Sequence, residues 1–290
     1  MALYAFDGTW NENQPQDEND TNVRKFFDAY GDKRKFYRAG PGTRFGWLGK
    51  ILGGVFGAGG KERVKEAYGE LEKNFRAGEK TIDIIDFSRG AALALDFANK
   101  IHSEAVAGIQ QPEIRFVGVW DVVPSFGIPG NDVNLGYVLT LPESVKKCFH
   151  AMALDERRQN FLLQRVVTTV PHATAEGRVY EVWFRGVHSD IGGGNKNLGL
   201  SSIKLHWMYK QALRCSLPIP EAEVAKQRQN MKPKTEISKN LDPVPNQSRT
   251  NSWTDVVHES VSSRPKANNS PKSLKLVNDE GQVSSKGFGE

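Results

Sequence analysis

Residues 81–98 constrain the fold most, because they encode a buried strand followed almost at once by a helix. The run 81–87 is mainly apolar, and Ser88 joins it to an apolar, helix-forming stretch. A serine between a strand end and a helix start, with Gly90 two residues later, is typical of a nucleophile elbow. The helix N-terminus would offer backbone N–H groups to an oxyanion. A complete elbow reads Gly-x-Ser-x-Gly, and Asp86 stands where the first glycine belongs.

The rest of the chain alternates between strand and helix patterns. Short apolar runs predict strands at 3–6, 35–38, 113–120 and 179–187. Apolar residues at helical spacing predict helices at 21–30, 64–75, 142–161 and 200–213, the first capped by Thr21 or Asp20. This alternation predicts an α/β fold, with a mostly parallel sheet and helices on both faces. Ligands of such sheets bind at the carboxyl ends of the strands, and Asp7, Ser88 and Asp121 each follow a predicted strand.

Two stretches depart from this alternation. The glycine-rich segment 53–60 has no following Gly-Lys-Ser/Thr, so we interpret it as a flexible loop near the site rather than a phosphate-binding loop. From residue 216 the composition shifts to Pro, Lys, Asn, Gln and Ser. We therefore expect a catalytic domain over residues 1–215 and a largely irregular polar tail over 216–290, with one docking segment near 252–262.

Composition excludes several classes of protein. No apolar run approaches the roughly 18 residues of a membrane span, and the N-terminus lacks the pattern of a signal peptide. We expect a protein that is cytoplasmic when made, with export by a signal-independent secretion system. Cys148 and Cys215 are too few for a disulfide framework. The net charge of +5 is scattered, which is compatible with transient contact with a membrane surface, and no nucleic-acid motif accompanies it.

Three residues satisfy the requirements of acyl transfer by a serine. Such a reaction needs a base that takes the serine proton and an acid that orients the base. α/β-Hydrolases supply them in the chain order serine, acid, histidine, from loops at strand carboxyl ends. Ser88, Asp121 and His188 occur in this order, each after a predicted strand. We therefore predict an α/β-hydrolase-like sheet with these three as catalytic residues.

The backbone N–H groups of Arg89, Gly8 and Thr9 are candidates for the oxyanion hole, because they lie at the helix start and in the turn after the first strand. The Arg89 guanidinium could bind a substrate phosphate or form an ion pair on the helix surface, and the sequence leaves both open.

Other residues compete for the catalytic roles. His258 is the main rival for the base, since a triad histidine can come late in a chain. Asp190 could replace Asp121 as the acid, although it lies only two residues from His188. Asp96 would point away from the site. The remaining histidines are expected on helices or in a loop: His102, His150, His206 and His172.

A series of short segments between residues 6 and 261 carries a family resemblance. In order they are 6–11 (FDGTWN), 21–23 (TNV), 53–59 (GGVFGAG), 87–91 (FSRGA), 118–121 (GVWD), 150–158 (HAMALDERR), 183–194 (WFRGVHSDIGGG) and 258–261 (HESV). Together they resemble the bacterial α/β-hydrolase domain family that includes type VI secretion phospholipase effectors. The resemblance covers residues 3 to about 213 and touches the tail.

The resemblance implies a carboxylic ester hydrolase, a serine esterase or lipase of the phospholipase A type, with Ser88, Asp121 and His188 as its triad. It also implies a lipid or other acyl-ester substrate, no cofactor, no metal, and a secretion-system or immunity protein as partner. Two features depart from the family. Asp86 replaces the first glycine of Gly-Phe-Ser-Arg-Gly, which could impair the elbow or shift the pKa of His188. The chain is also short beside effectors that carry large insertions for membrane contact.

Two other functional classes remain open from the sequence. A metal-dependent hydrolase could use Asp7, Asp121, His188 and Asp190 as ligands. A binding protein without catalytic activity could use the same scaffold, and Asp86 is the residue that favours this hypothesis.

Overall fold

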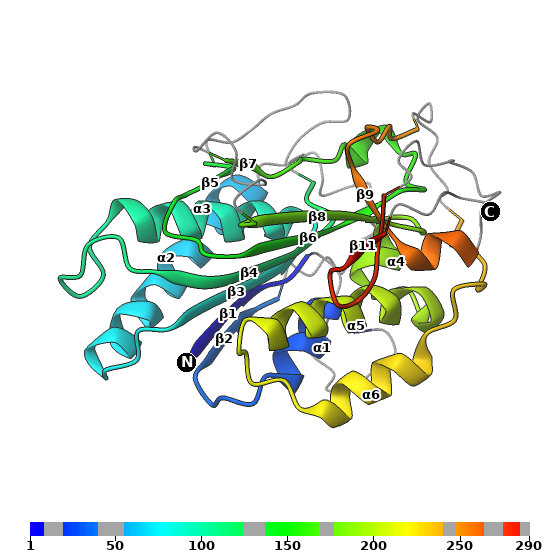
Figure 1. Cartoon of the computed structure of the whole chain (residues 1–290). Helices are drawn as coiled ribbons and strands as arrows, with labels where there is room; N and C mark the ends of the chain where they lie inside the picture. The colour runs from blue at the N-terminus through cyan, green and yellow to red at the C-terminus, as the bar shows by residue number, and fades with distance from the viewer. Residues whose placement is uncertain are drawn as a thin grey trace.

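A mostly parallel sheet forms the centre of the computed structural model (Figure 1). The structure describes residues 1–8, 20–39, 55–123, 137–168, 177–239, 248–263 and 275–284. Within them, nine strands lie side by side in the order β11 (Val283–Ser284), β10 (Lys275–Val277), β9 (Val256–His258), β8 (Val179–Phe184), β6 (Cys148–Ala153), β4 (Ile114–Trp120), β3 (Ile82–Phe87), β1 (Ala2–Phe6) and β2 (Lys35–Arg38). Every pair is parallel except β10 with β11.

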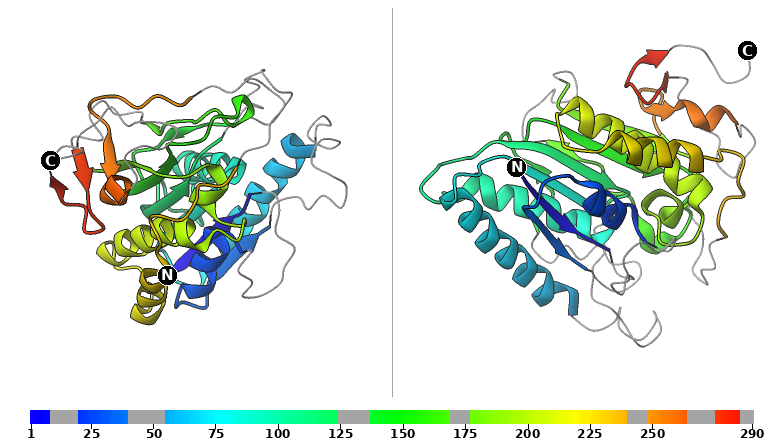
Figure 2. Two further views of the ribbon diagram at one scale, coloured as in Figure 1. Left: turned by 90° about the vertical axis from the view of Figure 1, so that its right-hand side faces the viewer. Right: turned by 90° about the horizontal axis from the view of Figure 1, so that it is seen from below.

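Helices cover both faces of the sheet, which confirms the predicted α/β architecture (Figures 1 and 2). On one face lie α2 (Val55–Arg76) and α3 (Arg89–Ser103), and on the other lie α1 (Asn22–Ala29), α5 (Leu198–Arg214) and α6 (Glu221–Asn230). The shorter elements are α4 (His188–Gly192), η1 (Gln159–Phe161), η2 (Glu259–Ser263) and a separate parallel pair of β5 (Thr140–Leu141) with β7 (Val167–Thr168). Among the described helices, none has the length and apolarity that crossing a membrane requires.

The alternation of side chains along β1 divides the core into two layers. Tyr4 and Phe6 pack in the cluster that includes α2 and α3, whereas Leu3 and Ala5 pack in the cluster that includes α1 and α5. All of these side chains are buried. Because successive side chains of a strand point to opposite faces, a strand covered on both faces is apolar throughout. The central strands therefore appear in the sequence as mainly apolar runs, with the buried Asp83 and Asp86 as exceptions in β3.

The helix predicted over 142–161 is wrong, because Cys148–Ala153 form β6 between β4 and β8. All six residues of β6 are buried. A short apolar run of this kind fits a buried strand and a buried helix equally well by periodicity. His150, expected on that helix, lies in the strand, where the Val122 N–H donates to its Nε2 over 3.2 Å and Glu181 lies 3.0 Å from its Nδ1. The segment Cys148–Ala153 is thus part of the central sheet.

Two other expected loops contain regular structure. Residues 55–60 of the glycine-rich segment begin α2, while 53–54 lie outside the described residues. In the polar tail, Glu221–Asn230 form α6, with Pro220 as N-cap and Glu221 and Glu223 in the first turn, where acidic side chains favour a helix start.

The tail also extends the sheet past β8, which corresponds to the last strand predicted from the sequence. β9, β10 and β11, coloured orange to red, form the edge opposite β2 (Figure 2). Val257 and Val261 are buried, so the segment near 252–262 docks on the core through β9 and η2. The boundary between the two proposed domains at residue 215 stays a prediction.

The start of α1 is fixed by one hydroxyl group. Thr21 Oγ1 accepts a hydrogen bond from Arg24 N over 3.1 Å and donates one to Asp7 Oδ2 over 2.5 Å. We expect Thr21→Val to lower the free energy of unfolding by about 1–2 kcal/mol, because the N-cap is lost while the shape is kept. Urea denaturation measures the change, and Thr21→Ser, which keeps the hydroxyl, should stay within about 0.5 kcal/mol of the wild type. Equal stability of the valine variant would contradict a role for the cap.

Candidate active site

Ser88 lies in a sharp turn between β3 and α3, as the elbow pattern predicts. Its backbone has φ 64° and ψ −128°, a strained conformation for a residue other than glycine. The Ser88 N–H donates to Trp120 O over 3.0 Å, which ties the turn to the end of β4. The Ser88 side chain makes no capping hydrogen bond to α3. The turn therefore holds the hydroxyl away from the helix backbone.

Two glycines make room for this turn. A Cβ on Gly8 would lie 3.3 Å from the Ser88 Cβ. A Cβ on Gly90 would lie 2.0 Å from Asp86 Oδ1 and 2.8 Å from the Phe6 carbonyl oxygen, closer than real Cβ atoms approach. The Asp86 side chain thus occupies the space that a side chain at position 90 would need. Because Gly90 leaves that space open, the strand, turn and helix of the elbow form with Asp86 in place of the usual glycine.

Ser88, His188 and Asp121 form a hydrogen-bonded series. His188 Nε2 lies 2.8 Å from Ser88 Oγ, and His188 Nδ1 lies 2.6 Å from Asp121 Oδ2. The three come from the turn after β3, the first residue of α4 and the end of β4. Because an ionised carboxylate only accepts hydrogen bonds, Nδ1 carries the imidazole proton and Nε2 accepts from the Ser88 hydroxyl. The arrangement can thus transfer the hydroxyl proton to Nε2.

The charges around this series keep Asp121 ionised and His188 neutral. Burial alone would raise the pKa of Asp121, but the Arg249 guanidinium and the hydrogen bond from His188 hold it well below its ordinary value. Burial lowers the pKa of His188, and Asp121 offsets only part of this effect. The imidazole is therefore unprotonated at neutral pH, the state in which it can act as a base.

The His188 ring is held by packing and by one backbone hydrogen bond. Phe87 and Phe161 lie against it with ring centroids 4.6 Å and 4.8 Å away. The His188 N–H donates to Glu156 Oε2 over 3.0 Å. Glu156 in turn accepts from Arg158 Nε and Nη2 over 3.0 Å and 2.9 Å, and its pKa is lowered to about 2 by these contacts in spite of its burial. These contacts fix the ring orientation.

The candidates for the oxyanion hole lie close to Ser88. Arg89 is the first residue of α3, where backbone N–H groups lack helical partners, and Gly8 is next to the Ser88 side chain. Thr9 lies outside the described residues. Burial lowers the pKa of the Arg89 guanidinium to about 10. The two roles expected for this guanidinium, phosphate binding and an ion pair, stay predictions.

Three acidic candidates make contacts apart from this series. Asp7 Oδ2 accepts from the hydroxyls of Thr21 and Tyr37. Asp190 Oδ2 accepts from the Val187 N–H over 3.1 Å at the start of α4, so it caps that helix. Asp96 accepts from the backbone of residue 138 over 3.0 Å. Among the described residues, Asp7 and Asp190 do not gather with Asp121 and His188 into a set of metal ligands.

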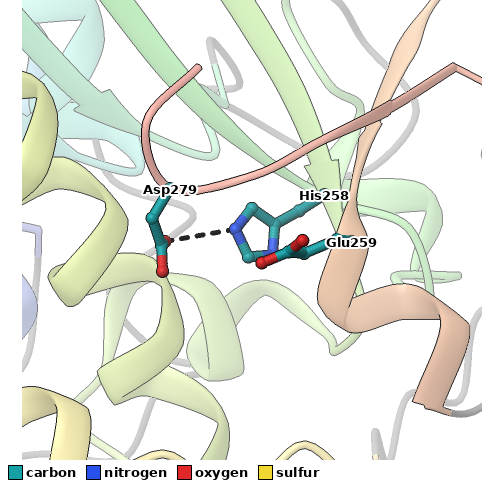
Figure 3. Close-up of side chains that lie close together, drawn as sticks. All are labelled: His258, Glu259 and Asp279. Atoms are coloured by element: carbon teal, nitrogen blue, oxygen red, sulfur yellow. Dashed lines mark hydrogen bonds and ion pairs between the residues drawn. The ribbon is translucent and has the colours of Figure 1, made fainter. Parts of the chain in front are cut away.

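His258 is not part of this series and faces Asp279 (Figure 3). Its Nε2 is 3.2 Å from Asp279 Oδ1, and its Nδ1 is 2.9 Å from Ser260 Oγ. His258, Glu259 and Asp279 are the only three potential metal ligands that gather within the described parts of the chain. Both nitrogens of His258 already have hydrogen-bonding partners, so the cluster is explained as a contact between β9 and the turn after β10.

Two of the remaining histidines lie on helices, as expected. His102 lies in the last turn of α3, and His206 on α5 has Nδ1 3.1 Å from Asp279 Oδ2. His172 lies outside the described residues.

Most of the chain matches one known protein family. Residues 3–106 and 95–211 match the family described as the catalytic domain of Tle1-like phospholipase effectors of the type VI secretion system. The chain belongs to this family. The matched residues run from within β1 to within α5, and they include Ser88, Asp121 and His188.

Solved structures resemble this Tle1-like chain over part of their length. A crystal structure of an uncharacterized protein from Pseudomonas aeruginosa is 20% identical, with a TM-score of 0.51 over 82% of this chain and 49% of that one. A structure of the Tle1 effector bound to the VgrG spike from the type 6 secretion system is 23% identical, with a TM-score of 0.45 over 67% of this chain and 51% of that one. This chain thus spans about half the length of each. Comparison with curated proteins gives no match.

Sequence reasoning missed three residues of the Tle1-like site, namely Glu156, Phe161 and Arg249. Glu156 lies in a segment that carries the family resemblance, but nothing in that segment indicated which atom it binds. Arg249 stands in a polar stretch without periodicity, and no pattern in the sequence points from it to Asp121.

Proposed function

We propose that this Tle1-like chain is a serine hydrolase that cleaves acyl esters of phospholipids, with Ser88, His188 and Asp121 as its catalytic triad. The observation that carries the proposal is the series of two hydrogen bonds, Ser88 Oγ to His188 Nε2 at 2.8 Å and His188 Nδ1 to Asp121 Oδ2 at 2.6 Å. Family membership supports a phospholipid as the ester, and a phospholipase A reaction is the finer part of the proposal.

The reaction follows from this geometry. His188 Nε2 takes the Ser88 proton as Oγ attacks the ester carbonyl, and the new imidazolium is stabilised by Asp121. The oxyanion would be bound by the backbone N–H of Arg89 and by the turn at Gly8. The imidazolium then gives its proton to the leaving alcohol oxygen, which leaves an acyl group on Ser88. Water, deprotonated by His188, hydrolyses the acyl-enzyme and restores the serine.

Delivery of the protein is a separate part of the proposal. Membership of a type VI effector family supports export by that secretion system, with a component of its spike and a protective immunity protein as partners. The substrate would then be the phospholipid of a membrane, reached by contact with the membrane surface.

Labelling with a fluorophosphonate probe tests the nucleophile, because the probe reacts with activated serines. We expect the wild-type protein to be labelled once, at Ser88, and Ser88→Ala to be unlabelled. Ser202→Ala is the matched control, since Ser202 is a buried serine on α5 whose hydroxyl bonds to Gln227 over 3.1 Å, and its labelling should equal that of the wild type.

Phospholipid vesicles test the substrate. We expect the protein to release fatty acid and lysophospholipid from the vesicles. This release should stop after fluorophosphonate treatment and should persist in EDTA. Labelling that survives in Ser88→Ala, or hydrolysis that EDTA abolishes, would contradict the serine mechanism.

A further inference from the structure

Arg249, in the C-terminal tail, brings a positive charge to Asp121, the carboxylate of the hydrogen-bonded series. Its Nη1 donates to Asp121 Oδ1 over 2.6 Å and to Ala153 O over 3.1 Å, and its Nη2 donates to Phe161 O over 2.5 Å. The side chain is 8% exposed and Asp121 is fully buried. One guanidinium therefore joins the candidate acid, the end of β6 and the 3-10 turn whose Phe161 ring lies against His188.

We propose that Arg249 is a positioning residue of the hydrolase, which fixes Asp121 toward His188 and makes activity depend on the docked tail. The inference rests on the proposed function, because it assigns Arg249 a role in the reaction of Ser88.

The two carboxylate oxygens of Asp121 have different hydrogen-bonding partners. Oδ2 faces His188, while Oδ1 accepts from the Ala153 N–H over 2.9 Å and from Arg249. A buried carboxylate is costly unless it is paired and hydrogen-bonded. The Ala153 N–H is a neutral donor, so Arg249 supplies the full positive charge on this side. Asp121 also has φ 43°, a backbone conformation that needs support from its surroundings.

Other contacts dock the tail, so that Arg249 is not its main anchor. Asp255 binds Arg165 over 3.1 Å and Trp183 Nε1 over 3.0 Å, and β9 pairs with β8. Val257 and Val261 of the tail are also buried, in a cluster with Trp183. Substitution of Arg249 should thus leave the tail in place, and its effect on the reaction can be measured separately from undocking.

The direction of the pH effect follows from the charges near His188. These are Asp121, Glu156 and Arg158, with Arg249 acting through Asp121. Removing the Arg249 charge leaves the Asp121 carboxylate less neutralised, which stabilises the imidazolium and raises the pKa of His188. Because the base must be unprotonated, the acid limb of the kcat/KM profile should move to higher pH.

The experiment compares Arg249→Gln, Arg249→Lys and Arg165→Gln in the full chain, with kcat/KM for a short acyl ester measured from pH 5 to 9. We expect Arg249→Gln to lower kcat/KM about 10- to 100-fold and to move the acid limb up by about one pH unit. Arg249→Lys keeps the charge, so its limb should stay near that of the wild type. Arg165→Gln loosens the docked tail without touching Asp121, so it should lower the melting temperature and leave the limb unmoved.

Each outcome separates the two proposals. Wild-type protein without Ser88-dependent hydrolysis would contradict the proposed function. Wild-type activity with an Arg249→Gln profile of unchanged height and pH dependence would overturn the role of Arg249. A third result would also overturn this role. If Arg249→Gln loses activity only in proportion to the loss of sites that react with fluorophosphonate, and its acid limb does not move, Arg249 is only a folding contact.

Discussion

Ser88→Ala is expected to lower kcat/KM for ester hydrolysis by about 10⁴- to 10⁶-fold, with little change in the free energy of unfolding. The hydroxyl is the only group that the substitution removes, and it makes no capping hydrogen bond to α3. The strained turn is held by the Ser88 backbone, whose N–H bonds to Trp120 O, so the alanine variant keeps that contact. Urea denaturation of the variant provides the control for folding.

The proposed triad should also show strong non-additivity. If Ser88 and His188 act as one unit, the double variant Ser88→Ala, His188→Gln should be as slow as either single variant, because nothing remains for the second change to remove. Asp121→Asn should lose about 10⁴-fold in kcat, since an amide at that position favours the wrong imidazole tautomer. Rate losses that multiply in the double variant would contradict the hydrogen-bonded series as the catalytic unit.

The sequence predicts the series well because each of its members follows a strand that is easy to recognise. β3, β4 and β8 are mainly apolar runs, and parallel strands bring their carboxyl ends to one edge of the sheet. Ser88, Asp121 and His188 follow those strands, so chain order and strand ends suffice to group them. The same physics explains why β1 and β2 were placed correctly.

The sequence could not predict β6 or Arg249. The apolar run of β6 is short enough to fit either kind of element, and only its neighbours β4 and β8 decide that it is a strand. Arg249 contacts Asp121 across 128 positions of the chain. A long-range ion pair of this kind depends on where the tail docks, and no local pattern of residues determines that position.

Asp86 stands where the nucleophile-elbow pattern has its first glycine, and its buried carboxyl should make folding stability depend on pH. Its Oδ1 accepts from the Phe87 N–H over 2.5 Å, while its Oδ2 is buried without a hydrogen-bonding partner among the described residues. Burial, reinforced by the nearby Asp7, raises the pKa of Asp86 well above its ordinary value, and Arg63 offsets this only in part. The carboxyl is therefore protonated in the folded protein at pH values where the unfolded chain has already ionised.

Asp86→Asn removes this titration and keeps the shape of the side chain against Gly90. A group whose pKa is raised by folding binds more protons in the native state, so its contribution to stability declines as pH rises above the unfolded pKa, near 4, toward the folded pKa. Asp7, whose pKa is raised to about 6, adds a similar loss between about pH 4 and 6 in both proteins. The stability difference between the two proteins should therefore grow in favour of Asp86→Asn above about pH 4, by up to about 1.4 kcal/mol for each pH unit, until Asp86 ionises in the folded protein.

Urea denaturation of both proteins from pH 5 to 8.5 measures this difference. Asp28→Asn is the matched control, because Asp28 is a more exposed aspartate on α1 paired with Arg24, and its stability curve should run parallel to that of the wild type. Parallel curves for Asp86→Asn as well would show that Asp86 is ionised in the folded protein throughout. If instead the gap widens with pH, the carboxyl behind Ser88 is a neutral acid. The elbow then tolerates Asp86 because Gly90 gives it space and because its proton removes its charge.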